Sequence, residues 1–366
     1  MMASRTRRAA ATAGFVVALV GGGAAPARAA GTGWSVFEAS AASRTVTMQP
    51  RAAALVSLVV EQYVGATQAL LDSAPRAQGY AATYGIPVAN DLHGAGIPLS
   101  YGGQCYANYP GEAQVDCGVP IPGVVAPRPP EGAPFDGGVF FARAKANGDA
   151  ADAEKLTASG VTESGGMRLG DVVDIGFNRS RSRTFIDDQG VHAVTASAAK
   201  NIQIGAALHI ASISAVAEAF HGGDLNSATG KASTDIEGVT IGGVPVAIGP
   251  EGVMVQGTKV ADAKGPDAEA VRKAMAGEGL SIEPLSAPAV TKDQSSGYVN
   301  ATASGFKVLL RRPTGDRFDI TFGDATARAT AARAAAAQSG SDLLLHGQQA
   351  AGAPASPAGR LEGEAA

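Results

Sequence analysis

The chain has 366 residues, a formal net charge of −4 and an isoelectric point of about 5.8. This acidic balance excludes the strongly basic composition that is typical of proteins that bind nucleic acid or anionic membranes, so we expect neither partner. Charged residues make up 17% and aromatic residues 5%, which indicates a thin core of Val, Ile, Leu and Ala in one large β domain or two smaller ones.

Residues 1–29 are typical of a secretory signal peptide. Three arginines lie among the first eight residues, residues 9–20 carry no charge, and Ala27-Arg28-Ala29 forms a small-x-small cleavage site. We expect cleavage near Ala29-Ala30 and a secreted protein that either is free or associates with the cell wall. The apolar run is shorter than the ~20 residues of a membrane span, so no transmembrane anchor is expected. The sequence leaves ordinary and twin-arginine export both open.

Residues 30–158 are expected to form an N-terminal β region. The stretch 34–48 alternates small and apolar residues and predicts one or two strands. Residues 55–71 fit both a helical stripe and a β alternation. Their many valines, together with Gly65, favour two strands joined near Gly65, with a helix as the alternative.

The segment 85–134 is rich in Gly and Pro and is predicted to be a long loop. Cys105 and Cys117 are the only cysteines of the chain, and in an oxidising compartment such a pair predicts a structural disulfide. Closing a loop of this length stabilises a fold by about 3 kcal/mol. Tyr101, Tyr106 and Tyr109 are the candidate binding surface of this region; the alternative is that they cover the sheet beneath.

Residues 159–330 are expected to form a repetitive antiparallel β region. A motif of two apolar residues followed by Gly recurs at 173–176, 202–205, 239–242 and 246–249, and 239–255 has the form of a β-meander with Gly-rich turns. The prediction is a mainly β fold with long twisted antiparallel sheets built from hairpins and meanders. One short helix is predicted near 266–276, because Pro266 opens an apolar stripe that Gly277 ends. Residues 331–366 are predicted to be a disordered tail of low complexity.

No motif predicts catalysis. The five histidines are scattered, no G-x-S-x-G or H-E-x-x-H motif occurs, and no two histidines have metal-ligand spacing. The glycine runs do not open helices, so phosphate-binding loops are not expected. We therefore expect no catalytic residues, no metal and no cofactor, and the chain is interpreted as a non-enzyme.

The stretch 237–253, the predicted helix and Gly279-Leu280-Ser281-Ile282 carry a resemblance. Together with the weaker match of residues 59–73, they resemble uncharacterised secreted β-rich proteins that are common in high-GC Gram-positive bacteria. The resemblance implies an extracellular, sheet-dominated protein and brings no catalytic residue or ligand. The disulfide loop has no counterpart in that pattern.

The leading hypothesis is a secreted or envelope-associated β-rich protein with a structural or binding role. The alternatives are a carrier of a lipid or other apolar ligand between sheet and helix, and a secreted hydrolase with its site in the 85–134 loops. The partner is left open among a cell-wall component, another secreted protein and an apolar ligand. The oligomeric state is also left open.

Overall fold

The computed structural model describes residues 33–51, 61–85, 104–111, 113–117, 135–136, 140–149, 152–169, 172–284 and 287–333. The predicted signal peptide, Tyr101 and the tail beyond Arg333 lie outside these residues. The predicted fold class is confirmed: the described chain is mainly β, its sheets are antiparallel, and it contains one helix.

Sheet A combines strands from both ends of the chain. Its strand order is β17-β20-β21-β1-β2-β3-β4, with β19 beside β21 and β18 beside β19. Its strands are β1 (Trp34–Arg51), β2 (Gln62–Asp72), β3 (Arg76–Gly85), β4 (Gln104–Tyr109), β17 (Leu280–Pro284), β18 (Ala289–Asp293), β19 (Tyr298–Ser304), β20 (Phe306–Arg311) and β21 (Arg317–Arg333).

Sheet B is an antiparallel meander of strands that mostly follow one another in sequence. Its order is β13-β12-β11-β10-β9-β8-β7-β5, with β6 beside β8. Its strands are β5 (Gln114–Cys117), β6 (Phe135–Asp136), β7 (Phe140–Asp149), β8 (Asp152–Leu169), β9 (Val173–Ile186), β10 (Val191–Ile204), β11 (Leu208–His221), β12 (Thr229–Ile241) and β13 (Val244–Pro245).

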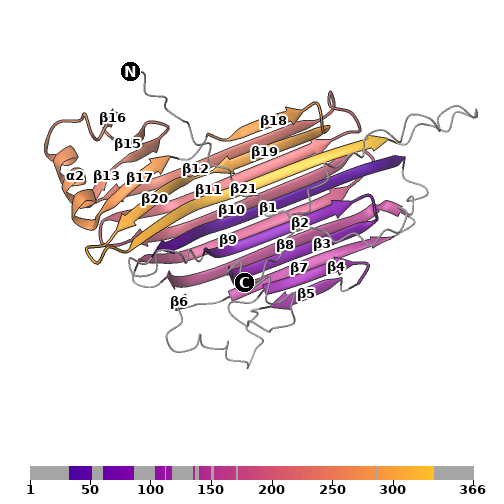
Figure 1. Ribbon diagram of the computed structural model, residues 1–366, viewed down its shortest axis with the longest axis horizontal. Coiled ribbons are helices and arrows are strands. Elements are labelled where there is room, and N and C mark those ends of the chain that lie inside the picture. The colour runs from indigo at the N-terminus through magenta and orange to yellow at the C-terminus, as the bar shows by residue number, and fades with distance from the viewer. Residues whose placement is uncertain are drawn as a thin grey trace, which may run out of the picture.

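A small third sheet and the helix connect sheet B back to sheet A. The small sheet consists of β14 (Ala247–Gly249), β15 (Gly252–Val255) and β16 (Thr258–Lys259), and the helix is α2 (Pro266–Glu278). The helix starts at the predicted proline and ends at Glu278, two residues later than predicted. Gly279 follows as its C-cap, with a left-handed φ of 63°. It buries Ala268 and Val271 at the end of the sandwich where Figure 1 places it.

Sheets A and B pack face to face as a sandwich of long, roughly aligned strands (Figure 1). β1 and β21 of sheet A lie over β10 of sheet B, and β2 and β3 lie over β8. The boundary that we expect at 158/159 falls inside β8, and β1 of the first region pairs with β21 of the second. Both expected regions therefore contribute to one sandwich.

A line of backbone kinks crosses each sheet and divides the core. Gly65 and Gly323 in sheet A and Gly166, Asn201 and Gly238 in sheet B have φ between 52° and 65°, and the ladder skips a pair at each of them. On β2 and β9, for example, inward-facing residues then lie three positions apart instead of two (Val64 and Thr67, Ile175 and Asn178), while the register of the ladder is the same on both sides of the kink. The predicted break near Gly65 is wrong, because β2 runs through this residue as a single strand.

The two halves of the core differ in side-chain size. On the side of the kinks that contains Ala41 and Ala69, mostly alanines fill the space between the sheets. On the side that contains Val46 and Val64, the residues that fill it are Val, Ile, Leu, Met and Phe. The motif copies at 173–176, 202–205 and 239–242 lie in the second half, where their Val and Ile residues are buried. Buried hydroxyl groups bridge the sheets between the halves, for example Thr45 Oγ1 to Ser180 Oγ at 2.8 Å and Thr67 Oγ1 to Ser182 Oγ at 2.8 Å.

In the alanine-rich half the sheets approach so closely that only glycine fits at some positions. A Cβ on Gly79 of β3 would lie 2.5 Å from the carbonyl oxygens of Lys145 and Ser159 in sheet B. A Cβ on Gly160 of β8 would lie 2.0 Å from the carbonyl oxygen of Tyr80 in sheet A. Backbone therefore packs directly against backbone here, and the sandwich has no room for a ligand between these strands.

Candidate binding face

The outer face of sheet B carries a column of arginines. Arg179, Arg181 and Arg183 are exposed on β9, because the intervening Ser180 and Ser182 point into the sandwich and are buried. Side chains on one face of a strand repeat every two residues, or about 7 Å, so the three guanidinium groups follow the strand at regular intervals.

A second basic column runs along β7 on the same face. The strand register places Lys145, Ser159 and Arg183 in one row across β7, β8 and β9, and Arg143, Val161 and Arg181 in the next row. We call these six residues the basic lane. The two cationic columns are two strands apart, about 10 Å, and the short side chains of β8 lie between them.

Few acidic groups neutralise the lane. Asp116 of β5 pairs with Arg143, with its Oδ1 2.6 Å from Nε. The hydrogen bond from Arg143 lowers the pKa of Asp116. Glu163 lies 3.7 Å from Arg179, at the end of the column. Arg181 and Arg183 form no ion pair with a described residue, and their neighbours on β8 and β10 are uncharged.

An aromatic block adjoins one end of the lane. Phe185, His192 and Phe220 form a row across β9, β10 and β11. The rings of Phe185 and His192 stack with centroids 4.3 Å apart, and the centroid of Phe220 lies 4.8 Å from that of His192. The guanidinium of Arg183 lies 4.5 Å from the centroid of Phe185, within cation–π range, so the lane and the block are continuous.

A carboxylate fixes the central ring of the block. Asp187 lies 3.1 Å from Nε2 of His192. Burial raises the pKa of Asp187, but hydrogen bonds from the backbone N–H of Gly190 and from His192 outweigh it and leave the pKa below its usual value. Asp187 therefore stays ionised and holds the imidazole between the two phenylalanines.

Of the three predicted tyrosines, Tyr106 and Tyr109 lie on opposite sides of one strand, and Tyr101 is outside the described residues. Tyr106 lies on the outer face of β4, whereas Tyr109 lies on its inner side against the alanine-rich core. Tyr106 instead stacks on Tyr80, with centroids 4.8 Å apart, and the hydroxyl oxygens of Tyr80 and Tyr63 are 2.7 Å apart. Tyr63 is only 3% exposed. Tyr63, Tyr80 and Tyr106 thus form a tyrosine cluster on the outer face of sheet A in which Tyr63 is buried and the other two are half-buried. Burial raises the pKa of Tyr106 to about 12.

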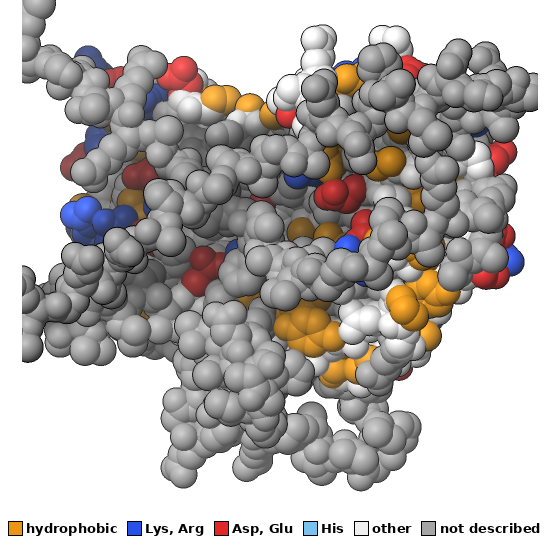
Figure 2. All heavy atoms as spheres, turned by 45° about the vertical axis from the view of Figure 1, so that its right-hand side comes forward, with side chains coloured by type: hydrophobic (Ala, Val, Ile, Leu, Met, Phe, Trp, Pro, Cys, Tyr) orange, Lys and Arg blue, Asp and Glu red, His pale blue; other side chains and the backbone are white. Residues whose placement is uncertain are grey.

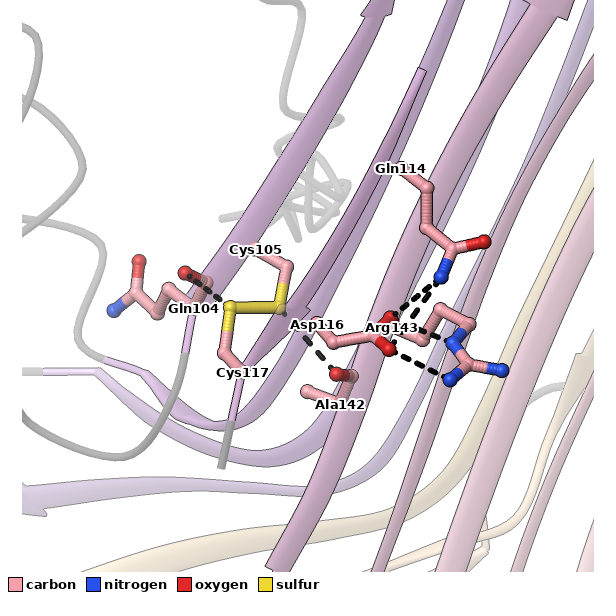
Figure 3. The surroundings of a disulfide bond; sticks show 7 residues. All are labelled: Gln104, Cys105, Gln114, Asp116, Cys117, Ala142 and Arg143. Carbon is pink, nitrogen blue, oxygen red and sulfur yellow. Dashed lines mark hydrogen bonds and ion pairs between the residues drawn. A yellow bond between two sulfur atoms is a disulfide. The ribbon is translucent and has the colours of Figure 1, made fainter. Parts of the chain in front are cut away.

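Cys105 and Cys117 form a disulfide at the edge of the sandwich (Figure 3). Cys105 is on β4, the edge strand of sheet A, and Cys117 is on β5, the edge strand of sheet B. The bond therefore joins the two sheets where backbone hydrogen bonds do not. Figure 3 also shows the Arg143–Asp116 pair beside it, which joins β5 to the neighbouring strand β7.

The histidines outside the aromatic block form no catalytic arrangement among the described residues. His221 is 2% exposed, and its Nδ1 accepts a hydrogen bond from the backbone N–H of Gly223, 3.2 Å away. It borders a shallow depression of about 270 Å³ with Val36 and Leu225. His209 is half-buried on β11, and the described residues contain no group of His, Cys, Asp or Glu that could hold a metal.

A second depression, of about 340 Å³, lies between the small sheet and the start of α2 and contains Asp262, Lys264 and Asp267. Figure 2 turns the right-hand side of the molecule forward, and there hydrophobic side chains gather at the lower right while acidic and basic side chains are scattered. The basic lane on sheet B is more uniform in charge than either depression.

The sequence analysis missed the basic lane. The alternating run Arg179-Ser180-Arg181-Ser182-Arg183 was visible in the sequence as a period of two, but its partner column at 143–145 depends on strand register. Comparison of the chain with protein-family models, with curated proteins and with solved structures gave no match. In the part of the chain that the structure describes, no helix has the length and hydrophobicity to span a membrane.

Proposed function

We propose that this protein is a secreted or envelope-associated binding protein without catalytic activity, and that the outer face of sheet B is its recognition surface. One observation carries the proposal: Arg181 and Arg183 are exposed beside a stacked aromatic block on a long and regular sheet face, and neither pairs with a carboxylate of the residues that the structure describes. Exposed Arg and aromatic groups are enriched where proteins meet partners.

The rest of the fold supports a rigid presenting scaffold. The close contact between the sheets and the disulfide at their edge limit the motion of the strands that carry the face. A disulfide of this kind is compatible with an oxidising, extracytoplasmic location. The outer face of sheet A is a weaker candidate, because its tyrosines pack against one another, with Tyr63 buried and Tyr80 and Tyr106 half-buried.

The alternatives receive less support. A carrier of an apolar ligand needs an enclosed apolar groove, and the two depressions described above are open and shallow. A hydrolase needs a histidine that bonds to a nucleophile or a carboxylate in a cleft. His192 does bond to Asp187, but it is stacked between two phenylalanines on an open face.

The experiment blocks one face at a time. Ala196→Trp places a large ring on β10 beside Arg181, and Thr326→Trp places the same ring on the exposed side of β21 in sheet A. Both positions are on strands, which accept aromatic residues. The purified chain and both variants are sedimented with isolated bacterial cell envelopes, and the bound fraction is measured against protein concentration.

We expect the unmodified chain and Thr326→Trp to bind alike and Ala196→Trp to bind at least tenfold more weakly. Circular dichroism and thermal unfolding verify that both variants are folded. Equal binding by all three proteins would assign recognition to another surface, and failure of the unmodified chain to sediment would refute an envelope-binding role.

A further inference from the structure

We propose that the basic lane binds an acidic polysaccharide, whose chain lies along β8 with its carboxylates between the cationic columns of β7 and β9. This inference rests on the proposed function, because it names the partner of the same face. It is carried by the shape of the lane, its unpaired charges and the adjoining aromatic block.

The shape of the lane selects an extended single chain. Ser159 and Val161 are short, whereas the residues on both sides of them in their rows are Lys145 and Arg143 on β7 and Arg183 and Arg181 on β9. Long side chains on both sides of short ones form a track parallel to the strands. Columns about 10 Å apart leave space for one polymer chain and not for a duplex.

The charges of the lane select repeated anions. Each of the two rows offers one cation from either side, and the rows are about 7 Å apart, so two successive carboxylates of a polymer can be contacted. The guanidinium groups of Arg181 and Arg183 are free to donate two parallel hydrogen bonds to a carboxylate, which is the geometry that an arginine fork favours. Arg143 already donates to Asp116 in this way, from Nε and from Nη2.

The surroundings of the lane favour an acidic sugar chain over a broad polyanion. Phe185, His192 and Phe220 form a half-buried, weakly polar block at the end of the lane, in which the rings pack against one another. The C–H groups of a sugar ring can pack against the outward edge of this block, while its acid groups continue into the lane. Away from the lane the same face carries Glu218, Asp235 and Glu237 on β11 and β12. These carboxylates and the net charge of −4 oppose a broad polyanion such as double-stranded nucleic acid.

The test uses polygalacturonate as the probe and its fully methyl-esterified form as the uncharged control with the same backbone. Binding to the full chain is measured by isothermal titration at low and at moderate salt. The lane variant is Arg181→Gln with Arg183→Gln. Its matched control is Lys273→Gln with Arg311→Gln, which removes the same charge from exposed positions on α2 and β20.

We expect polygalacturonate to bind the unmodified chain and its methyl ester to bind at least tenfold more weakly. The lane variant should bind polygalacturonate at least tenfold more weakly than the unmodified chain, and the control variant should bind it with unchanged affinity. The lane variant should also show a shallower dependence of affinity on salt, because two fewer cations take part. A change in folding would alter thermal unfolding, which the lane variant should leave unchanged.

Three results would overturn the inference: equal binding of the acid and its ester, equal binding by the two double variants, or tighter binding of single-stranded DNA or polyphosphate than of polygalacturonate. The proposed function fails independently. If Ala196→Trp abolishes envelope binding and the lane variant retains it, sheet B is the recognition surface but its partner is not an acidic polysaccharide.

Discussion

Gly160→Ala tests whether the sheets of the alanine-rich half are packed backbone against backbone. The new Cβ would lie 2.0 Å from the carbonyl oxygen of Tyr80. Close C···O contacts in proteins are about 3.3 Å or longer, so β8 and β3 must separate by roughly 1.3 Å at this point. The opposing atom is backbone held between β2 and β4, and it cannot turn away as a side chain could.

The expected cost follows from these contacts. Overpacking costs about 1–3 kcal/mol, and the upper end applies because two laddered sheets must move. The lower entropy of alanine in the unfolded chain offsets about 0.4–1 kcal/mol. We therefore expect the free energy of unfolding to fall by about 2–3 kcal/mol, and Tm to fall by roughly 3–5 °C for a folded region of this size.

The control is Gly165→Ala on the same strand. Its Cβ would lie 3.5 Å from the carbonyl oxygen of Gly176, an ordinary contact, so stability should stay within about 1 kcal/mol of the parent. Thermal and urea unfolding followed by circular dichroism measure both variants. If Gly160→Ala is as stable as Gly165→Ala, the sheets are farther apart than described and the reasoning is refuted.

Two further predictions concern the edge of the sandwich and its buried histidine. Replacing both Cys105 and Cys117 by Ala should cost about 3 kcal/mol and should raise amide hydrogen exchange in β4 and β5 before β10; uniform exchange would contradict a local role for the disulfide. Burial lowers the pKa of His221, with nearby Lys292 acting in the same direction and Asp224 against it. As the pH falls, His221 is therefore protonated in the unfolded chain before it is protonated in the folded one. The free energy of unfolding should decline as the pH falls below about 6.5. His221→Asn should make Tm between pH 7.5 and 5.0 less dependent on pH, and an unchanged slope would exclude this group as the cause.

The fold class could be predicted because local patterns and the final structure agree along most of the chain. The helix begins at Pro266 as predicted, because a proline at the first turn and Asp267 and Glu269 beside it favour a helix start. The motif copies also ended in strands that pack in one half of the core. The pattern failed near Gly65, since the kink there shifts the inward phase within β2 and mimics a strand end.

The candidate site was harder to predict, because it depends on pairing between distant segments. Tyr106 and Tyr109 are three residues apart, and an odd separation within a strand puts side chains on opposite faces. The glycines and prolines of their segment predict a loop, where this rule does not apply. The basic lane needs β7 and β9 at a fixed register on either side of β8, which no local pattern contains.

The pairing of β1 with β21 constrains the order in which the chain can fold. Every hairpin of sheet B from β7 to β12 joins strands that are neighbours in sequence, so these hairpins can form as soon as their residues are available. In sheet A, β1 gains its second neighbour only when residues 317–333 arrive. During synthesis from the N-terminus, one long edge of β1 therefore stays without its partner until β21 is available. This open edge is a site for mispairing with another chain. The risk is smaller when β21 is synthesised soon after β1.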